Sequence, residues 1–287
     1  MGAAGEPCYI VERRFSIRYR FSLASDSCGT SNSLSLQQII FLFFAAGLGG
    51  ALNSVAGGGS FVSFPALLFV GVPPIPANAT NTLALWTAAA ASGGAYRHRL
   101  NIPRSVLIPL IAASLLGGLA GAFLLLKTPA HTFMQVLPWL TLGATLLFAF
   151  GERLAGRRLS GIGHEASRTA VIGAALFQLV VAVYGGYFGG GMGIVMLAML
   201  AMLGMTDIHD MNALKSVMGF VINGVAVVAF IVAKAVYWRH GLIMIGGGIV
   251  GGYFGAHYAQ KLPQAWVRGF VILVGTGMTV YFFVLAY

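Results

Sequence analysis

Long apolar runs separated by short polar segments fill this chain from Leu36 to its end. Four of them, at 36–56, 77–96, 103–126 and 132–150, are 19 to 24 residues long. About 20 residues of helix cross the roughly 30 Å of hydrocarbon in a bilayer, and a helix satisfies its own backbone hydrogen bonds there. The runs therefore predict an all-α integral membrane protein with the lipid bilayer as its surroundings.

Composition supports that prediction, because 58% of the 287 residues are hydrophobic and only 8% are charged. Soluble proteins have about 25% charged residues, so soluble enzymes, disordered regulators and disulfide-stapled secreted domains are excluded. The 17 Lys and Arg against 7 Asp and Glu give a net charge of +10. Most of these basic residues fall between apolar runs, where they set orientation and meet anionic lipid. Nucleic acid is therefore not an expected partner.

The distribution of the runs predicts four segments. Residues 1–35 form a polar, basic arm without the apolar core of a signal peptide, and its plainer interpretations are a disordered cytoplasmic arm or a start placed too early. Two transmembrane repeats follow, at 36–150 and 169–287, joined by a cytoplasmic linker at 151–168. Each repeat contains about four long helices and one helix that is too short to span. The long runs of the second repeat lie at 169–188, 210–233, 241–260 and 266–287.

Three sequence blocks recur in nearly one register, which predicts an internal duplication. The triplets at 57–59 and 189–191 are all glycine and lie 132 residues apart. A second block aligns at an offset of 134 and pairs Asn78 with Asn212 and Thr82 with Ser216. The third block aligns Gly117-Gly118-Leu119-Ala120-Gly121 with Gly247-Gly248-Ile249-Val250-Gly251.

Each glycine triplet ends a long apolar run and precedes one that is too short to span, at 60–71 and 192–204. Twelve residues of helix reach only about 18 Å. Non-helical backbone at membrane depth leaves polar groups unpaired, so it is tolerated only inside the protein or along a wet cavity. Two broken or re-entrant helices at matching positions of two repeats indicate the binding site of a transporter.

The predicted site favours a small anionic substrate. All seven acidic residues lie outside the interiors of the apolar runs, so a cation pump or carboxylate proton relay is not indicated. Backbone amides at the start of a short helix attract anions without a basic side chain. We predict substrate-binding groups in the two breaks and the first turns of the following spans: Asn53, Gly57, Gly58, Gly59, Ser60, Asn78, Thr80, Asn81, Gly189, Gly190, Gly191, Met192, Asn212, Lys215 and Ser216. No catalytic residue, metal site or cofactor is predicted.

Several of these residues also have plainer interpretations. Lys215 lies near Asp207 and Asp210, so extension of its side chain to the interface is an equal alternative. Asn and Thr at the start of a span commonly cap a helix. Glycines at small-xxx-small spacing let helices pack closely, and such faces also permit homo-oligomers. His257 is best interpreted as a packing residue.

Topology depends on whether each long-plus-short pair crosses the membrane once or returns as a hairpin. A single crossing gives eight crossings with both termini cytoplasmic, and it places 13 basic residues against 3. A returning hairpin inverts the second repeat and places 9 against 7. The positive-inside rule favours the first arrangement. The inverted one stays open, because without the four arm arginines both give 9 against 3.

Several blocks together resemble the sulfite exporter TauE/SafE family: Gly47-Leu48-Gly49-Gly50, Gly57-Gly58-Gly59, Pro65, Gly71-Val72-Pro73-Pro74, Ala77-Asn78-Ala79-Thr80-Asn81, Gly185-Gly186, Gly189-Gly190-Gly191, Gly204 and Asn212 to Ser216. The resemblance covers about residues 36–287. It implies a multi-pass permease of the plasma (inner) membrane that moves small sulfur-containing or organic anions such as sulfite or organosulfonates. Leu214 and Lys215 stand where the first repeat has Thr80 and Asn81, so the two repeats contact a substrate differently.

The sequence thus predicts a secondary membrane transporter for such anions and not an enzyme. The two breaks are expected to meet near the midplane while one half rocks against the other. A proton-coupled carrier of small carboxylates, built on the same site, is the main alternative. An intramembrane hydrolase using Ser60 and His257 lacks a nucleophile elbow and a buried acid. An assembly protein held by its glycine faces is the remaining alternative.

Overall fold

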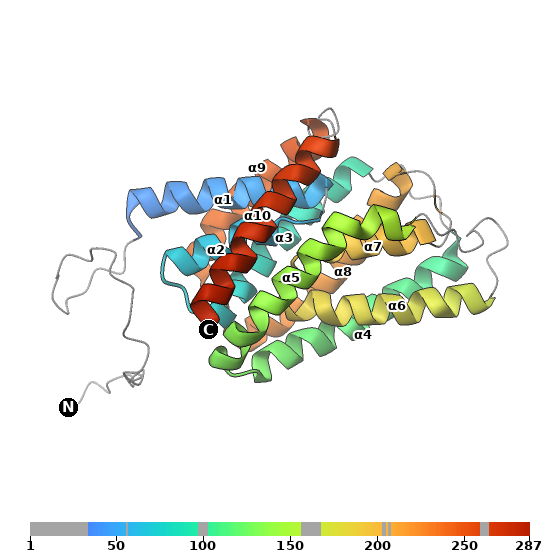
Figure 1. The fold of residues 1–287 in the computed structure, drawn as a ribbon, viewed down its shortest axis with the longest axis horizontal. Coiled ribbons are helices and arrows are strands. Elements are labelled where there is room, and N and C mark those ends of the chain that lie inside the picture. The colour runs from blue at the N-terminus through green and yellow to red at the C-terminus, as the bar shows by residue number, and fades with distance from the viewer. Residues whose placement is uncertain are drawn as a thin grey trace. The chain divides into compact units, whose positions relative to one another are not determined.

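A computed structural model describes residues 34–55, 57–96, 103–155, 168–202, 205, 208–258 and 264–287. Its regular elements are all helices in these ranges (Figure 1). The first half contains α1 (Leu36–Val55), α2 (Ser60–Phe69), α3 (Pro74–Tyr96), α4 (Arg104–Lys127) and α5 (Ala130–Ala155). The second half contains α6 (Arg168–Tyr187), α7 (Met192–Met202), α8 (Ile208–Val232), α9 (Trp238–Tyr258) and α10 (Gln264–Ala286).

The helix order confirms the all-α prediction, with a short helix second in each half. α3 begins three residues before the predicted start, because Pro74 occupies its first position, where proline needs no amide hydrogen and has a suitable φ. The predicted arm at 1–35 lies almost entirely outside the described residues, as do 156–167 of the predicted linker. Residues 35–287 form one compact unit.

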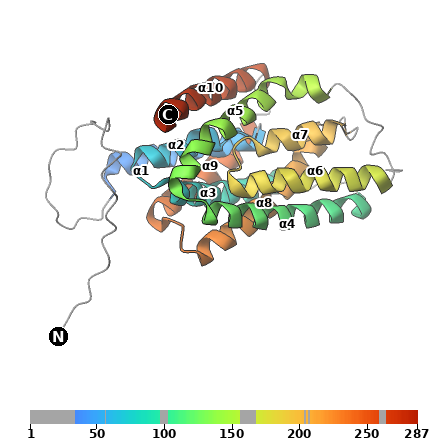
Figure 2. The ribbon, with the colours of Figure 1, turned by 60° about the horizontal axis from the view of Figure 1, so that its bottom comes forward.

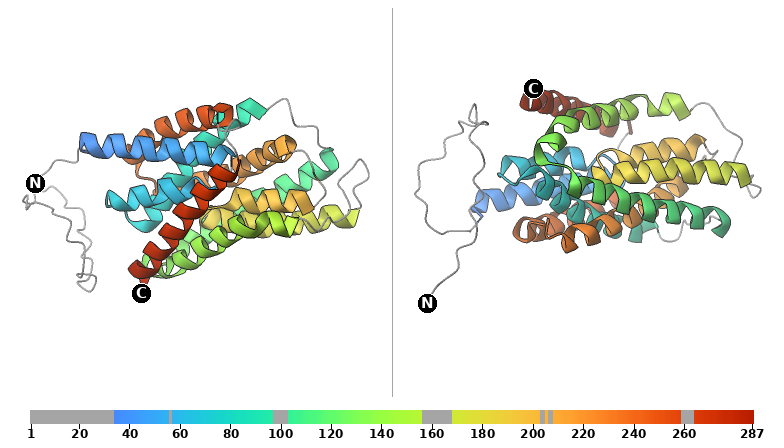
Figure 3. Two further views of the ribbon diagram at one scale, coloured as in Figure 1. Left: turned by 45° about the horizontal axis from the view of Figure 1, so that its top comes forward. Right: turned by 90° about the horizontal axis from the view of Figure 1, so that it is seen from below.

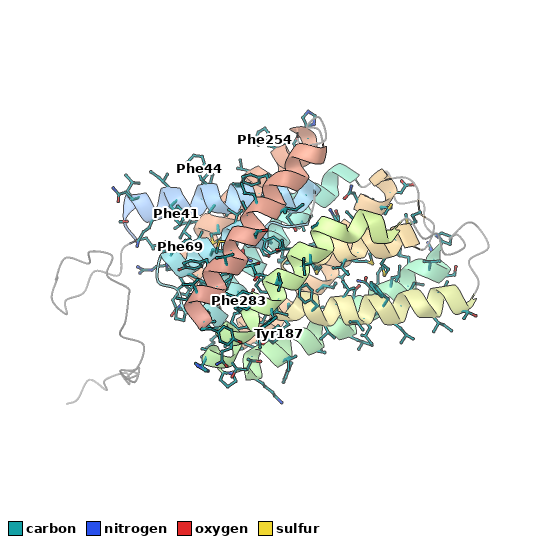
Figure 4. The ribbon with its side chains drawn as sticks, in the orientation of Figure 1. Phe41, Phe44, Phe69, Tyr187, Phe254 and Phe283 are labelled. Atoms are coloured by element: carbon teal, nitrogen blue, oxygen red, sulfur yellow. The ribbon has the colours of Figure 1, made fainter. Side chains whose placement is uncertain are left out.

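Among the described residues, three helices are long and apolar enough to cross a membrane by length and composition, and they cover Leu36–Ser54, Arg104–Lys127 and Asp210–Val232. Large apolar side chains also face outward from the helices. Phe44 of α1 and Phe254 of α9, for example, are 68% and 51% exposed and project from the outside of the structure (Figure 4). Such an apolar exterior fits lipid rather than water.

Each short helix folds back along the long helix before it. Gly49 of α1 lies beside Ser63 of α2, whereas Asn53, one turn later in α1, lies beside Gly59 just before α2. The two helices are therefore antiparallel. α7 likewise returns beside α6 (Figure 2). Both pairs of a long and a short helix are therefore hairpins, so the favoured topology, in which each pair crosses the membrane once, is wrong. Each half has three further long helices after its hairpin.

Glycines bring two helix pairs into backbone contact. A Cβ on Gly251 of α9 would lie 2.6 Å from the Cα of Gly47 in α1. A Cβ on Gly117 of α4 would lie 2.6 Å from the carbonyl oxygen of Leu179 in α6. Real Cβ atoms do not approach other atoms so closely, so only glycine fits at these positions. The predicted packing role of the glycine-xxx-glycine faces is confirmed.

These contacts interleave the two halves of the sequence. α1 and α3 pack along α9, and together with α2 they form what we call the first bundle. α6 and α8 pack along α4, and with α7 they form the second bundle. α5 pairs with α10 across both bundles (Figure 3). Each bundle thus contains one helix from the other half of the sequence, α9 in the first bundle and α4 in the second. The bundles therefore differ from the two sequence halves that were expected to rock against each other.

Candidate functional site

The helix breaks lie where the glycine triplets predict them. The amide of Gly57 donates to the carbonyl of Leu52, five residues earlier, at 3.1 Å. The amide of Gly189 donates in the same way to the carbonyl of Tyr184 at 3.2 Å. Gly57 and Gly189 then turn the chain with φ of +78° and +75°, a region that favours glycine. The two breaks therefore begin with the same turn, but they differ at the third glycine, where Gly191 has a φ of +77° and Gly59 has a φ of −58°.

The two breaks meet in the interior. A Cβ on Gly57 would lie 2.7 Å from the Cα of Gly193, in the first turn of α7. A Cβ on Gly193 would lie 2.9 Å from the Cα of Gly57. We call this contact of Gly57 with Gly193 the glycine junction. Gly58, Gly59, Gly190 and Gly191 are buried as well, so the predicted contact of the two breaks is confirmed, while its depth near the midplane stays a prediction.

Polar side chains of α3 hold the first break. The Nδ2 of Asn81 donates to the Oγ of Ser60 at 3.3 Å, and the Oγ of Ser63 donates to the Oδ1 of Asn81 at 2.5 Å. All three side chains are buried. No side chain caps the first turn of α2, whose N-cap residue is Gly59. The amides of Phe61, Val62 and Ser63 in this turn donate to the carbonyls of Gly58 and Gly59, so only amides that precede Phe61 are left as donors for a ligand.

A second side chain of α3 reaches the other break. The Nδ2 of Asn78 donates at 3.0 Å to the carbonyl of Tyr187, the last residue of α6. The Oδ1 of Asn78 is buried without a hydrogen-bond partner. Asn78 therefore joins the first half to the second break, and its remaining polar atom is unsatisfied, which is costly inside a protein.

Lys215 lies beside the glycine junction. Its Cδ is 3.2 Å from the position of a Cβ on Gly193, so its side chain passes along the first turn of α7. The residue is only 5% exposed, and its Nζ has no hydrogen-bond partner. The side chain therefore does not extend to the surface, and that alternative is wrong. A buried amino group without a partner at two helix breaks is suited to receive an anion.

The structure places the other predicted site residues as follows. Asn212 and Ser216 share one face of α8 with Lys215, and both are buried. Asn53 is half-buried beside Gly59.

Two of the predicted residues have their side chains engaged elsewhere. Thr80 accepts a hydrogen bond from the amide of Tyr237 before α9, at 3.0 Å. Met192 packs its side chain against Gly185 in a hydrophobic cluster formed with α4, α6 and α8.

Sequence reasoning missed Tyr184. Its hydroxyl donates to the carbonyl of Gly190 within the second break, and its ring packs against all three hydrophobic clusters. The carbonyl and amide of a trans peptide point in opposite directions, so this bond also orients the amide of Gly191. Leu52 stands at the equivalent place in the first half, so the repeat gave no signal for a tyrosine.

Replacing Tyr184 with Phe should remove about 1–2 kcal/mol of stability, because the ring stays while the buried Gly190 carbonyl loses its donor. Unfolding of the purified protein in detergent would measure this loss. Tyr253→Phe is the control, since Tyr253 is 59% exposed. Equal stability of the two variants would show that the Tyr184 hydroxyl does not hold the break.

The proposed hydrolase pair gains no support. Ser60 is buried and bound to Asn81, whereas His257 is exposed in the last turn of α9. Within the described ranges, no cluster of three or more His, Cys, Asp or Glu could hold a metal ion.

Comparison with known proteins gives a consistent result. The model of the sulfite exporter TauE/SafE family matches residues 42–282. A probable membrane transporter protein of Haemophilus influenzae is 29% identical over 86% of this chain and 94% of its own length. The probable membrane transporter protein YfcA of Escherichia coli is 27% identical over 87% of this chain and 92% of its own length.

A third relative, the probable membrane transporter protein ORF9 of a Sinorhizobium species, is 24% identical over 86% of this chain and 93% of its own length. No solved structure matches this chain. Because the family model spans both glycine breaks and nearly all of the helices, this multi-pass membrane protein belongs to the sulfite exporter TauE/SafE family of membrane transporters.

Proposed function

We propose that this protein is a secondary carrier of small sulfur-containing or organic anions, such as sulfite and organosulfonates. One observation carries the proposal, namely a buried lysine without a partner beside the contact between two broken helices. A buried charge needs an opposite charge close by, and the substrate supplies it. Lys215 thus acts as the charged anchor of the site.

The breaks supply hydrogen-bond donors for the substrate's oxygens. α2 begins without a side-chain cap at Gly59, and the first turn of α7 lies at the glycine junction. Amides at helix starts bind oxyanions such as sulfate and phosphate. A site of unwound backbone between two broken helices is also the arrangement by which many secondary transporters bind substrates.

Helix packing supports the proposed internal duplication. Each pairing in the first bundle has an equivalent in the second, since α1 packs on α9 as α6 packs on α4, and α3 packs on α9 as α8 packs on α4. Hairpins at the start of each half leave an odd number of crossings, which makes the repeats inverted. The segments 97–104, 151–168 and 261–268 then share one side, and their basic residues make it the cytoplasmic side of the inner membrane.

A transport assay tests the proposal. The full chain is reconstituted in vesicles, and uptake of sulfite and of simple organosulfonates is measured with small carboxylates as competitors. We expect sulfonates to enter and to be displaced poorly by carboxylates. A carrier of carboxylates would give the reverse order, and absence of uptake and of binding for every anion would refute the transport site.

Alternating access then requires the two bundles to move against each other. Apart from the glycine junction and the hydrogen bond from Asn78 to Tyr187, the bundles meet at α3 and α8, where the rings of Trp86 and Phe220 stack with centroids 5.3 Å apart. Backbone contacts at glycine hold α9 in the first bundle and α4 in the second. Rocking is therefore expected at the α3–α8 contact and not between the two halves of the sequence.

Two crosslinked pairs distinguish these motions, after both native cysteines, Cys8 and Cys28, have been changed to Ser. A short thiol crosslinker between W86C and F220C, on α3 and α8, should abolish transport. The same reagent between L83C and G241C, on α3 and α9, should leave transport intact, because these residues lie in one bundle. Both pairs join the two sequence halves, so loss of transport with both would contradict the interleaved bundles.

A further inference from the structure

The charge that surrounds the proposed site sets the charge of its substrate. Among the side chains that the structure describes, Lys215 is the single charged one that is buried. The other buried polar side chains at the proposed site, those of Ser60, Ser63, Asn78, Asn81, Asn212 and Ser216, are neutral. Counted over these described side chains, the formal charge at the junction is one positive unit when Lys215 is protonated.

Helix dipoles add little to that charge. α2 and α7 place their positive N-termini at the breaks, but α1 and α6 end at the same breaks with their negative C-termini. Each end corresponds to about half an elementary charge of its own sign, so the two ends at each break largely offset each other. The amides there act as hydrogen-bond donors, and Lys215 supplies the net charge.

The two halves also differ at the position that carries this charge. Asn81 occupies the place in α3 that Lys215 occupies in α8. Asn81 is already bound to Ser60 and Ser63, whereas the Nζ of Lys215 is without a partner. The site therefore has one cation, although a lysine at both equivalent positions would have given it two.

We infer that the site selects singly charged oxyanions over doubly charged ones and that Lys215 determines this selection. This inference rests on the proposed function. A monoanion is neutralised by the single lysine. A dianion would leave one negative charge buried without compensation, which low-dielectric surroundings strongly disfavour. Hydrogen sulfite and monosulfonates are therefore substrates, while sulfate and the sulfite dianion are rejected.

Binding of two fixed-charge probes tests this inference. Methanesulfonate carries one negative charge and sulfate carries two, and both present a tetrahedral sulfur with oxygens. Titration of the purified full chain at constant ionic strength should give a Kd for methanesulfonate that is lower by about tenfold or more, the effect of one uncompensated buried charge. Equal or tighter binding of sulfate would overturn the charge inference and leave the carrier proposal standing. If neither probe binds, the proposed site itself fails.

Three variants locate the selection. Lys215→Asn, which copies the neutral residue of the first half, should lose methanesulfonate binding, and Lys215→Arg should retain it. Asn81→Lys adds a second cation and should move the Kd ratio toward sulfate by about tenfold or more. Lys234→Asn is the matched control, because Lys234 is exposed after α8 and Asn tolerates its φ of +53°. If the ratio of the methanesulfonate Kd to the sulfate Kd is unchanged in both Lys215→Asn and Asn81→Lys, other groups determine the selection.

Discussion

Replacing Gly251 with Ala should destabilise the protein severely. The new methyl group would lie 2.5 Å from the carbonyl carbon of Gly47, and both atoms belong to helices that cannot shift locally. α1 and α9 would have to separate along their whole contact. Overpacking of this kind costs about 3 kcal/mol or more, which is a large part of the stability of a typical domain.

The measurement is thermal unfolding of the variant in detergent, together with its elution as a single species. Gly277→Ala is the control, because nothing lies within 4 Å of a Cβ at Gly277 in α10. Alanine favours helix over glycine, so this control should be as stable as the parent. If Gly251→Ala also unfolds at the parent temperature, the close packing of α1 on α9 is wrong.

Replacing Gly57 with Ala should abolish transport. The side chain would meet the Cα of Gly193 at 2.7 Å and push α7 away from the glycine junction. A displacement of about 1 Å in a binding site lowers its efficiency by about a hundredfold. The φ of +78° adds about 1 kcal/mol of backbone strain for an L-residue.

Gly71 separates the two causes. Its φ is +88°, but nothing lies within 4 Å of a Cβ there, so Gly71→Ala imposes the same strain without the steric contact. We expect Gly71→Ala to lose about 1 kcal/mol of stability and to keep transport. Gly193→Ala, which has the contact without the positive φ, should behave like Gly57→Ala. Similar transport in all three variants would contradict the junction as the site.

The sequence predicts much of the fold because its signals are local. Apolar length and the glycine triplets place both helix breaks, and α2 and α7 start at the residues expected from them. The direction of the short helices could not be predicted in this way, since a crossing helix and a returning one have the same composition. The positive-inside rule favoured the wrong arrangement, because only the arm arginines separated the two charge tallies.

Local sequence signals could not predict which distant segments contact each other. Spacing identifies Gly247 and Gly251 as a packing face but does not name α1 as the partner. Lys215 could be recognised as a candidate, yet its burial depends on how α7 and α8 pack. Substrate binding by Asn78, Asn81, Lys215 and the other predicted residues stays a prediction, although the structure gathers several of them around the glycine junction.

The exchange of α4 and α9 between bundles affects how the chain acquires its structure during synthesis. α1 is made first, but the helix that covers its glycine face, α9, begins about 180 residues later. Contacts of such long range form late in folding. A nascent chain that has completed only its first half thus holds a small-residue face in lipid without its permanent neighbour. That face is open to transient association with other helices until the ninth helix is released into the membrane.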